Sequence, residues 1–238
     1  LTLALRQPVL IPRPETEELV EHVLQAHARP EREAEAARTF LDVGCGSGAI
    51  GLALLHSLSD STCVAIDVSA EAVALATENA ARCGVAGRYT AQLVAGGIAS
   101  YGAVDVSNSA IAGECGDTDA RRPPRFDVIV SNPPYIPRAD MPTLEREVVG
   151  YEDERALCGG TDGLDVVRDL LSVAPRLLRP EGPRAIWLEV DPSHPPLIQE
   201  WLAREPQASE LRMELVRWLS DGFGRPRFCE VRWLGPPS

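Results

Sequence analysis

The sequence contains no run of about 18 apolar residues, so it offers no candidate membrane span. It opens without an apolar signal segment and small-residue cleavage site, which argues against a secretory leader. Its first residue is Leu1 rather than methionine, so we expect a processed or trimmed chain. The six cysteines include no C-x-x-C pair, and this scattering argues against a zinc site and a disulfide framework. We therefore expect reduced thiols, no bound metal and no membrane partner.

Positive charge is also scarce in this chain. Lys and Arg together number 23 against 35 Asp and Glu, which gives a formal net charge of −12 at pH 7. Binding to a phosphate backbone depends on many cationic side chains, so we expect no direct nucleic-acid partner. The length of 238 residues and the hydrophobic content of 45% are sufficient for one large domain with a full core.

Hydrophobic patterning after residue 38 alternates between strands and helices. The expected strands cover residues 39–43, 63–68, 89–95, 126–131 and 185–190, and the expected helices cover residues 49–58, 70–82, 165–178 and 197–204. Residues 211–219 and 227–234 are expected to form a closing strand pair. Repeated strand–helix units predict an α/β fold with a doubly wound, mostly parallel sheet, which binds ligands at the carboxyl ends of its strands.

The segments outside this pattern are assigned more coarsely. Residues 1–38 are expected to form an N-terminal extended segment and a helix from Glu15 toward His27, leading into a catalytic domain at 39–238. Residues 96–125 show little periodicity and receive no structural interpretation. The acidic cluster at 145–154 is expected to be a solvated face.

A glycine-rich turn lies between the first strand and the first helix of this domain. It reads Asp42-Val43-Gly44-Cys45-Gly46-Ser47-Gly48, and glycine lets the backbone turn sharply and approach a ligand closely. Asp67 ends the second expected strand, where a carboxylate can accept hydrogen bonds from both hydroxyls of a ribose. Cys45 has no histidine or other base beside it, so we expect a small loop residue and not a nucleophile. The two features together predict a nucleotide-like ligand.

The turn by itself does not identify that ligand. Gly44, Gly46 and Ala49 also satisfy the dinucleotide fingerprint G-x-G-x-x-G/A. Asp42, which could reach the amino end of a methionine group, and the additional Gly48 favour S-adenosylmethionine. A dinucleotide and a merely structural turn remain the alternatives.

A second motif, Asn132-Pro133-Pro134-Tyr135, directly follows the strand expected at 126–131. Asn132 therefore lies at a carboxyl end, facing the same cleft as the glycine-rich turn. The two prolines fix two φ angles and remove two N–H donors, which leaves a stiff turn with exposed acceptors. Two fixed acceptors can hold the N–H protons of an amide or aromatic amino group and aim its lone pair at a methyl group. With Tyr135 able to stack on the flat group, the motif predicts methylation of a planar nitrogen.

With these motifs the sequence resembles the HemK/PrmC family, the glutamine methyltransferases of translation termination factors. The resemblance extends over nearly the whole chain and is most specific at Pro12-Arg13-Pro14-Glu15-Thr16, because other amino-methyltransferases share the Asn-Pro-Pro-Tyr turn without it. Further matching segments are Leu41–Gly48, Ala65–Asp67, Val130–Tyr135 and Ala156–Asp165. The closing segments Glu189–Pro192 and Gly224–Phe228 look most like the animal mitochondrial branch.

The resemblance implies a Rossmann-like class I methyltransferase, whose seven-stranded sheet has an antiparallel last strand. Its substrates would be S-adenosyl-L-methionine and the glutamine of the Gly-Gly-Gln loop in peptide-chain release factors. Gly44 to Gly48 and Asp67 would bind the cofactor, and Asn132 would contact both cofactor and substrate. The glutamine would be framed by Pro133, Pro134 and Tyr135, so that Asn132, Pro133 and Tyr135 are the expected catalytic residues. We expect a monomer located in the mitochondrion, or in the cytoplasm of a bacterium, and the family's small helical N-terminal domain is expected upstream of Leu1.

One stretch departs from the family pattern. The family's third strand ends with an acid near the adenine, whereas Leu93–Ile98 contains no acid. None of the four histidines is placed like a general base, and we expect surface or packing roles for them. Three other functions stay open: an adenine-N6 methyltransferase of nucleic acid, an NAD-dependent oxidoreductase and a non-catalytic binding module.

Overall fold

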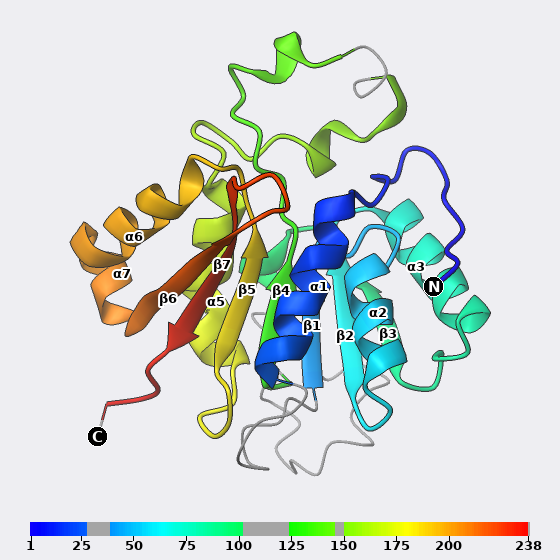
Figure 1. Cartoon of the computed structure of the whole chain (residues 1–238), viewed down its shortest axis with the longest axis horizontal. Coiled ribbons are helices and arrows are strands. Elements are labelled where there is room, and N and C mark those ends of the chain that lie inside the picture. The colour runs from blue at the N-terminus through cyan, green and yellow to red at the C-terminus, as the bar shows by residue number, and fades with distance from the viewer. Residues whose placement is uncertain (28–38, 102–123, 146–149, 238) are drawn as a thin grey trace.

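A computed structural model of the chain describes residues 1–27, 39–101, 124–145 and 150–237. Its centre is a seven-stranded sheet with the strand order β3-β2-β1-β4-β5-β7-β6 (Figure 1). The strands are β1 Thr39–Val43, β2 Thr62–Asp67, β3 Tyr89–Leu93, β4 Val128–Ser131, β5 Ala185–Glu189, β6 Met213–Ser220 and β7 Pro226–Trp233. The α-helices are α1 Pro14–His27, α2 Ala49–Ser57, α3 Ala70–Arg82, α5 Asp165–Leu177, α6 His194–Arg204 and α7 Pro206–Glu210.

The first five strands run parallel to one another, whereas β7 is antiparallel to both β5 and β6. The predicted doubly wound α/β sheet with an antiparallel last strand is therefore confirmed. The chain proceeds outward from β1 through β2 to β3, then returns to β4 on the other side of β1. The switch point of the sheet lies between β1 and β4, which is where such folds bind ligands.

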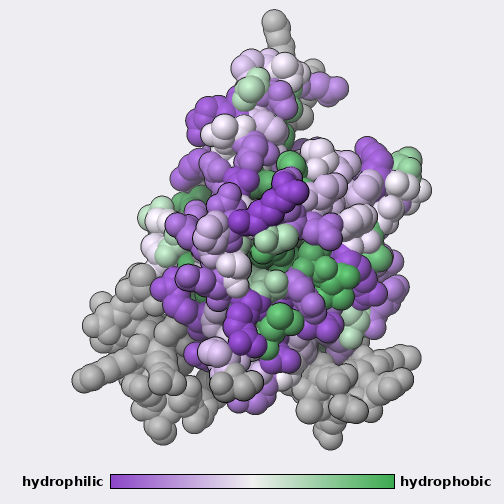
Figure 2. All heavy atoms as spheres, turned by 90° about the vertical axis from the view of Figure 1, so that its left-hand side faces the viewer, coloured by the Kyte–Doolittle hydropathy of each residue, from purple (hydrophilic) through white to green (hydrophobic). Residues whose placement is uncertain are grey.

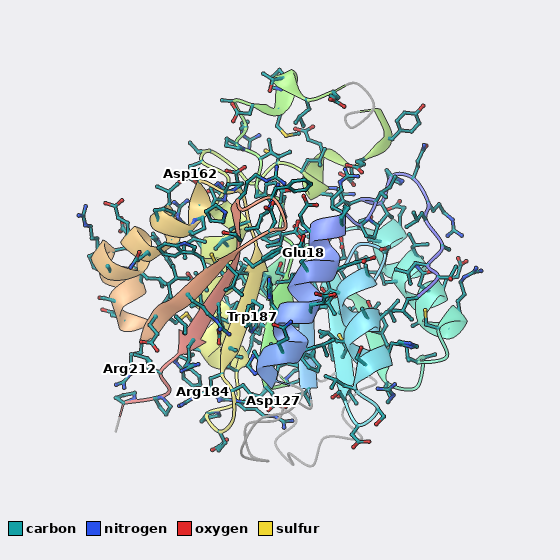
Figure 3. The ribbon with its side chains drawn as sticks, in the orientation of Figure 1. Glu18, Asp127, Asp162, Arg184, Trp187 and Arg212 are labelled. Atoms are coloured by element: carbon teal, nitrogen blue, oxygen red, sulfur yellow. The ribbon has the colours of Figure 1, made fainter. Side chains whose placement is uncertain are left out.

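Side chains of the central strands alternate between two buried clusters, one on each face of the sheet. In β5, Ile186 and Leu188 pack in the cluster that includes α5, whereas Ala185 and Trp187 pack in the cluster that includes α1 and α2. This alternation is the period of two that a strand buried on both faces requires. Figure 3 shows Trp187 near the centre of the molecule, where its Nε1–H donates to His27 Nε2 at 3.0 Å. That hydrogen bond attaches the end of α1 to the sheet.

Several element boundaries differ from the prediction for local reasons. Helix α6 begins at His194 rather than at residue 197, because prolines are tolerated in a first helical turn, whose N–H groups have no partner within the helix. Strand β4 begins at Val128 rather than at residue 126. Before it, Asp127 Oδ2 accepts hydrogen bonds from both the amide and the hydroxyl of Thr39, which ties the starts of β1 and β4 together.

Part of the predicted organisation lies outside the described residues. This holds for 28–38, for most of the uninterpreted stretch 96–125 and for 146–149 of the acidic cluster. Within the described chain, Ile98–Ser100 forms a short 3-10 helix, η2. No helix of the described part is long and apolar enough to cross a membrane. Hydrophilic residues cover most of the face seen in Figure 2, with a smaller hydrophobic area near its middle.

Candidate active site

A pocket of about 170 Å³ opens at the carboxyl ends of β1, β2 and β4. It lies at the switch point, and its walls come from seven segments of the chain. These are the N-terminal segment Pro8–Leu10, the strand ends Val43–Gly44 and Ile66–Ser69, the region of Val94, Gly97 and Ile98, the turn residues Asn132 and Pro134, and a last group of Asp153, Arg155, Ala156, Val166 and Asp169 with Ala72. Among these lining residues there is no histidine, and the described chain has no cluster of three metal-ligating side chains.

Of the glycine-rich turn, Gly44 lines this pocket, whereas Cys45, Gly46, Ser47 and Gly48 are not among its lining residues. Gly44, Gly46 and Gly48 have φ angles of 70°, 54° and 85°, so the chain turns through conformations that side chains rarely adopt. Gly48 is also crowded, because an added Cβ would lie 2.9 Å from the Tyr89 hydroxyl oxygen. The amide of Gly44 donates to the Ile66 carbonyl at 2.8 Å, which holds the turn over the end of β2. The turn is therefore a fixed backbone cradle at the start of α2.

Asp67 lies beneath the cradle and lines the pocket, as expected. Its Oδ2 accepts from the Gly46 amide at 2.9 Å and its Oδ1 accepts from the Ser69 amide at 2.9 Å. Burial raises the pKa of Asp67, and the hydrogen bonds from Gly46 and Ser69 oppose that rise. Each carboxylate oxygen has a second lone pair, so the group can also accept from two hydroxyls of a ligand.

Asp42 lies in β1, two residues before the first glycine of the turn. The side chain is fully buried behind the turn and is not among the pocket-lining residues. Its Oδ2 accepts from the Gly51 amide at 3.0 Å, so it fastens α2 to β1. Burial raises the pKa of Asp42 to about 7. The expectation that this carboxylate reaches the methionine end of a cofactor stays a prediction, and in the structure the buried Asp42 side chain holds the start of α2.

The turn Asn132-Pro133-Pro134-Tyr135 stands beside the cradle, because β1 and β4 are paired with Val43 opposite Ser131. A Cβ built on Gly44 would lie 4.0 Å from the carbonyl oxygen of Asn132. Of the four turn residues, Asn132 and Pro134 line the pocket and Pro133 is buried. The structure thus brings the cradle, Asp67 and the Asn132 amide to a single cavity.

Tyr135 points away from that cavity toward the β6–β7 hairpin. Its hydroxyl accepts from Arg227 Nη1 at 3.3 Å, and the Arg227 guanidinium carbon lies 5.7 Å from the centre of its ring. Burial raises the pKa of Tyr135, and the Arg227 charge acts against that rise. In this conformation the ring stacks on an arginine of the protein, which sequence reasoning had not identified as its neighbour.

Close packing supports the turn from the side of residues 156–165. The amide of Ile136 donates to the Leu157 carbonyl at 2.9 Å, and the Gly159 amide donates to the Ile136 carbonyl at 2.8 Å. A Cβ on Gly159 would lie 2.6 Å from the Pro134 carbonyl oxygen. Glycine in the segment 156–165 therefore allows its backbone to pack directly against the backbone of the turn, which restricts the movement of the turn.

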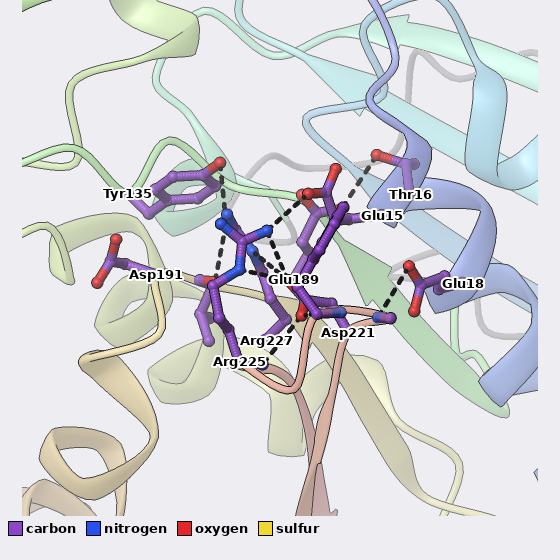
Figure 4. A network of polar contacts seen from close by, with 12 residues as sticks. Glu15, Thr16, Glu18, Tyr135, Glu189, Asp191, Asp221, Arg225 and Arg227 are labelled. Carbon is purple, nitrogen blue, oxygen red and sulfur yellow. Dashed lines mark hydrogen bonds and ion pairs between the residues drawn. The ribbon is translucent and has the colours of Figure 1, made fainter.

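A buried polar chain reaches Asn132 from the opposite side. Asn132 Nδ2 donates to Thr16 Oγ1 at 3.3 Å. Thr16 Oγ1 donates in turn to Glu189 Oε2 at 3.0 Å (Figure 4). Glu189 ends β5 and is 1% exposed, and burial raises its pKa to about 7. Sequence reasoning missed both Thr16 and Glu189 as site residues. An acid at the end of a buried strand next to β4 was the available signal.

Near the pocket lie a charged hydrogen-bonded pair and several exposed apolar side chains. Arg13 Nη2 contacts both oxygens of Glu152, at 2.8 and 2.9 Å, and Glu152 is only 8% exposed. The expected solvated face at 145–154 is therefore wrong for Glu152. Exposed apolar side chains occur at Ile11 and Tyr151, which are close in sequence to lining residues, and, with 83% exposure, at Phe223 on the β6–β7 hairpin tip.

Comparison with known proteins gives concordant results. A family model described as the methyltransferase small domain matches residues 19–102. A human protein described as MTRF1L release factor glutamine methyltransferase is 40% identical over 238 residues, which are 99% of this chain and 64% of that protein. A Deinococcus radiodurans protein described as release factor glutamine methyltransferase is 36% identical over 226 residues, which are 95% of this chain and 67% of that protein. The chain thus spans about two thirds of the length of these relatives.

A solved structure of a methyltransferase from Pyrococcus furiosus has the same fold. The TM-score is 0.59 with 16% sequence identity, and the match covers 98% of this chain and 89% of that one.

Proposed function

The chain belongs to the family of release factor glutamine methyltransferases, and from that premise we propose that it methylates a glutamine of a peptide-chain release factor. The target would be the side-chain nitrogen of the glutamine in the Gly-Gly-Gln loop, and the methyl donor would be S-adenosyl-L-methionine. The observation that carries the proposal is the Asn132 amide, which lines the same cavity as Asp67 and the glycine cradle. A ribose-binding carboxylate and a fixed carboxamide in one pocket suit a nucleoside cofactor beside a substrate with N–H groups.

The described residues fit S-adenosylmethionine, which supplies a methyl group on a positively charged sulfur when bound. Asp67 would accept hydrogen bonds from the ribose hydroxyls, and the backbone of Gly44–Gly48 would follow the methionine portion. Val94 and Ile98 line the pocket and provide apolar surface for a flat base. These apolar contacts take the place of the acid that the family pattern has at the end of β3.

The chemistry requires an acceptor rather than a strong base. An amide nitrogen is a poor nucleophile, because its lone pair is delocalised into the carbonyl group. The Asn132 side-chain oxygen and a carbonyl of the turn can each accept one N–H of the substrate amide. Held in this way, the nitrogen is polarised and its lone pair is aimed at the methyl group. Pro133 and Pro134 keep those acceptors fixed, so no reorganisation is needed during the transfer.

A protein substrate fits the surface better than a nucleic acid does. The chain carries a net charge of −12, which favours a basic protein loop over a phosphate backbone. Exposed apolar side chains at Ile11, Tyr151 and Phe223 are of the kind that protein partners cover. We further propose that the protein is located in the mitochondrion, because its closing segments resemble the animal mitochondrial branch. We also propose that it is a monomer.

The proposal is tested with labelled S-adenosylmethionine and a release factor, either intact or with its Gly-Gly-Gln glutamine changed to alanine. We expect label on the intact factor and none on the altered one. Equal labelling of both, or none at all, would reject the proposal. Transfer to an adenine-containing oligonucleotide instead would support the adenine-N6 reading, and binding of NADH with no binding of S-adenosylmethionine would support an oxidoreductase.

Asn132→Ala tests the acceptor. We expect kcat to fall by about 100- to 1,000-fold, the usual effect of removing one fixed acceptor or donor from an active site. Binding of S-adenosylhomocysteine by calorimetry should change little. Gln207→Ala, on an exposed residue of α7, is the matched control and should keep full activity. Full turnover by Asn132→Ala would mean that the acceptor is elsewhere.

A further inference from the structure

The chain Asn132, Thr16 and Glu189 joins three segments that are far apart in the sequence. Asn132 follows β4, Thr16 lies in the first turn of α1 and Glu189 ends β5, with separations of 116 residues for the first pair and 173 for the second. Thr16 and Glu189 are both buried, at 5% and 1% exposure. Neither lines the pocket, so they reach it only through Asn132.

The chemistry of these groups gives the chain a direction. An ionised carboxylate can only accept hydrogen bonds, so Thr16 must donate its single hydroxyl proton to Glu189. The Thr16 oxygen can then only accept from Asn132, which selects the amide nitrogen Nδ2 and not the oxygen. Because the amide is planar, fixing Nδ2 on Thr16 directs the oxygen Oδ1 away from Thr16, and Asn132 is a residue that lines the pocket. A reversed amide would place two donors, or two acceptors, face to face.

We propose that Glu189 is a positioning residue: directly and through the Thr16 hydroxyl, it fixes the orientation of the Asn132 amide and so presents the Asn132 oxygen, rather than the NH2 group, to the substrate nitrogen. The proposal rests on the proposed function for the identity of that substrate. It also gives a physical role to Thr16 in the segment Pro12–Thr16. That segment is the most specific part of the family resemblance, and the residues of the catalytic turn do not explain it.

The relay depends on Glu189 being ionised. A protonated Glu189 can donate to Thr16, and Thr16 can then donate to the Asn132 oxygen, which removes the acceptor from the pocket. Burial raises the pKa of Glu189 to about 7, while Thr16 and Asn132 stabilise its charged form by hydrogen bonding. The other charged groups that face it are Arg227 on β7, which lowers its pKa, and Glu15 on α1, which raises it.

The kinetic test compares Thr16→Val, Thr16→Ser and Glu189→Gln with the unaltered chain. We expect Thr16→Val and Glu189→Gln to lower kcat by about tenfold, the effect of one misdirected hydrogen bond, with KM for S-adenosylmethionine unchanged. Thr16→Ser keeps the hydroxyl and should retain nearly full kcat. Equal kcat for the valine and serine variants would overturn the proposal.

The pH profile separates positioning from a purely structural role. The rate of the unaltered chain should rise with pH through about 7 as Glu189 ionises, and Glu189→Gln should lose that rise. The glutamine side chain that is methylated does not titrate in this range, so the increase of the rate with pH does not come from the reacting group. A profile for Glu189→Gln with the same inflection as that of the unaltered chain would contradict the relay.

A spectroscopic test needs no substrate. The chain has three asparagines, so ¹⁵N labelling of asparagine gives three side-chain NH2 signals, and Asn132→Ala identifies the one that matters. We expect the Asn132 signal to shift with an inflection near pH 7, the inflection to vanish in Glu189→Gln and its amplitude to decrease in Thr16→Val. An Asn132 signal that does not titrate would overturn the relay even with release-factor methylation intact. A titrating signal without methylation would reject only the proposed function.

Discussion

The backbone of Gly163 lies directly against the carbonyl oxygen of Tyr135. A Cβ built on Gly163 would overlap that oxygen and would also lie 2.8 Å from the His194 ring. With a φ angle of 82°, Gly163 also has a backbone conformation that side chains rarely adopt. A glycine 28 residues after Tyr135 in the sequence thus sets how closely the catalytic turn can approach α6 and the start of α5.

Gly163→Ala should therefore damage both stability and catalysis. We expect the free energy of unfolding to fall by roughly 2–4 kcal/mol, from left-handed strain and from overpacking against fixed backbone. Displacement of the turn should also lower kcat at least tenfold or so, because small misplacements of reacting groups are costly. Urea denaturation and single-turnover methyl transfer measure the two effects.

Gly84→Ala is the matched control for that prediction. Gly84 has a φ angle of 72°, but an added Cβ would meet no atom within 4 Å. Gly84→Ala should therefore lower the free energy of unfolding only by the backbone strain, about 1 kcal/mol, and leave kcat unchanged. If both variants lose the same stability and keep the same kcat, the contact with Tyr135 does not position the turn.

Asp67→Ala should weaken cofactor binding more than it slows the transfer step. We expect Kd for S-adenosylhomocysteine to rise by about 10- to 100-fold, because two hydrogen bonds to a charged acceptor are lost. At saturating S-adenosylmethionine, kcat should stay within a few-fold of the unaltered value. Calorimetry and initial rates at several cofactor concentrations give both quantities. Unchanged affinity would show that Asp67 serves only to hold the Gly46 and Ser69 amides.

Local patterns in the sequence were sufficient to predict most of the fold. The mostly apolar stretches at 39–43 and 185–190 predicted buried parallel strands, because strands covered on both faces are apolar at nearly every position. Ser69 directly precedes the helix expected at 70–82, a position where serine is a common cap, and its Oγ accepts from the Ala72 amide at 3.3 Å. Such signals operate over a few residues, so they can be read without knowing the tertiary structure.

The candidate site was predictable only where its residues belong to local motifs. Gly44–Gly48 and Asn132 were identified from their positions after strands. The partners of Asn132 and Tyr135, which are Thr16 and Arg227, lie 116 and 92 residues away, so no spacing rule finds them.

Cys45 lies within the cofactor cradle but should have no chemical role. It is buried, and burial raises the pKa of its thiol, so the nucleophilic thiolate does not form. Cys45→Ala should keep kcat within about twofold and lower the free energy of unfolding by roughly 1 kcal/mol through the small cavity. Iodoacetamide should modify Cys83 and Cys158, which are partly exposed, well before Cys45. Loss of transfer in Cys45→Ala at normal cofactor affinity would contradict this.

The hydrogen bond from Trp187 to His27 predicts how acid affects stability. Burial lowers the pKa of His27 from 6.5 to about 4, so the unfolded chain binds a proton that the folded chain excludes. The contribution of neutral His27 to the free energy of unfolding is complete above about pH 6.5. It is lost as the pH falls toward 4, and the loss is on the order of 3 kcal/mol.

His27→Gln keeps an acceptor for the Trp187 N–H and does not titrate. Urea denaturation of both proteins should show the variant gaining relative stability by roughly 2–3 kcal/mol between about pH 7.5 and pH 4.5. Asp42 and Glu189, whose pKa values burial raises to about 7, change the free energy of unfolding with pH in the opposite direction. Both proteins contain these two residues, so their effects cancel when the two free energies are subtracted. A difference independent of pH would mean that His27 is not held neutral in the folded state.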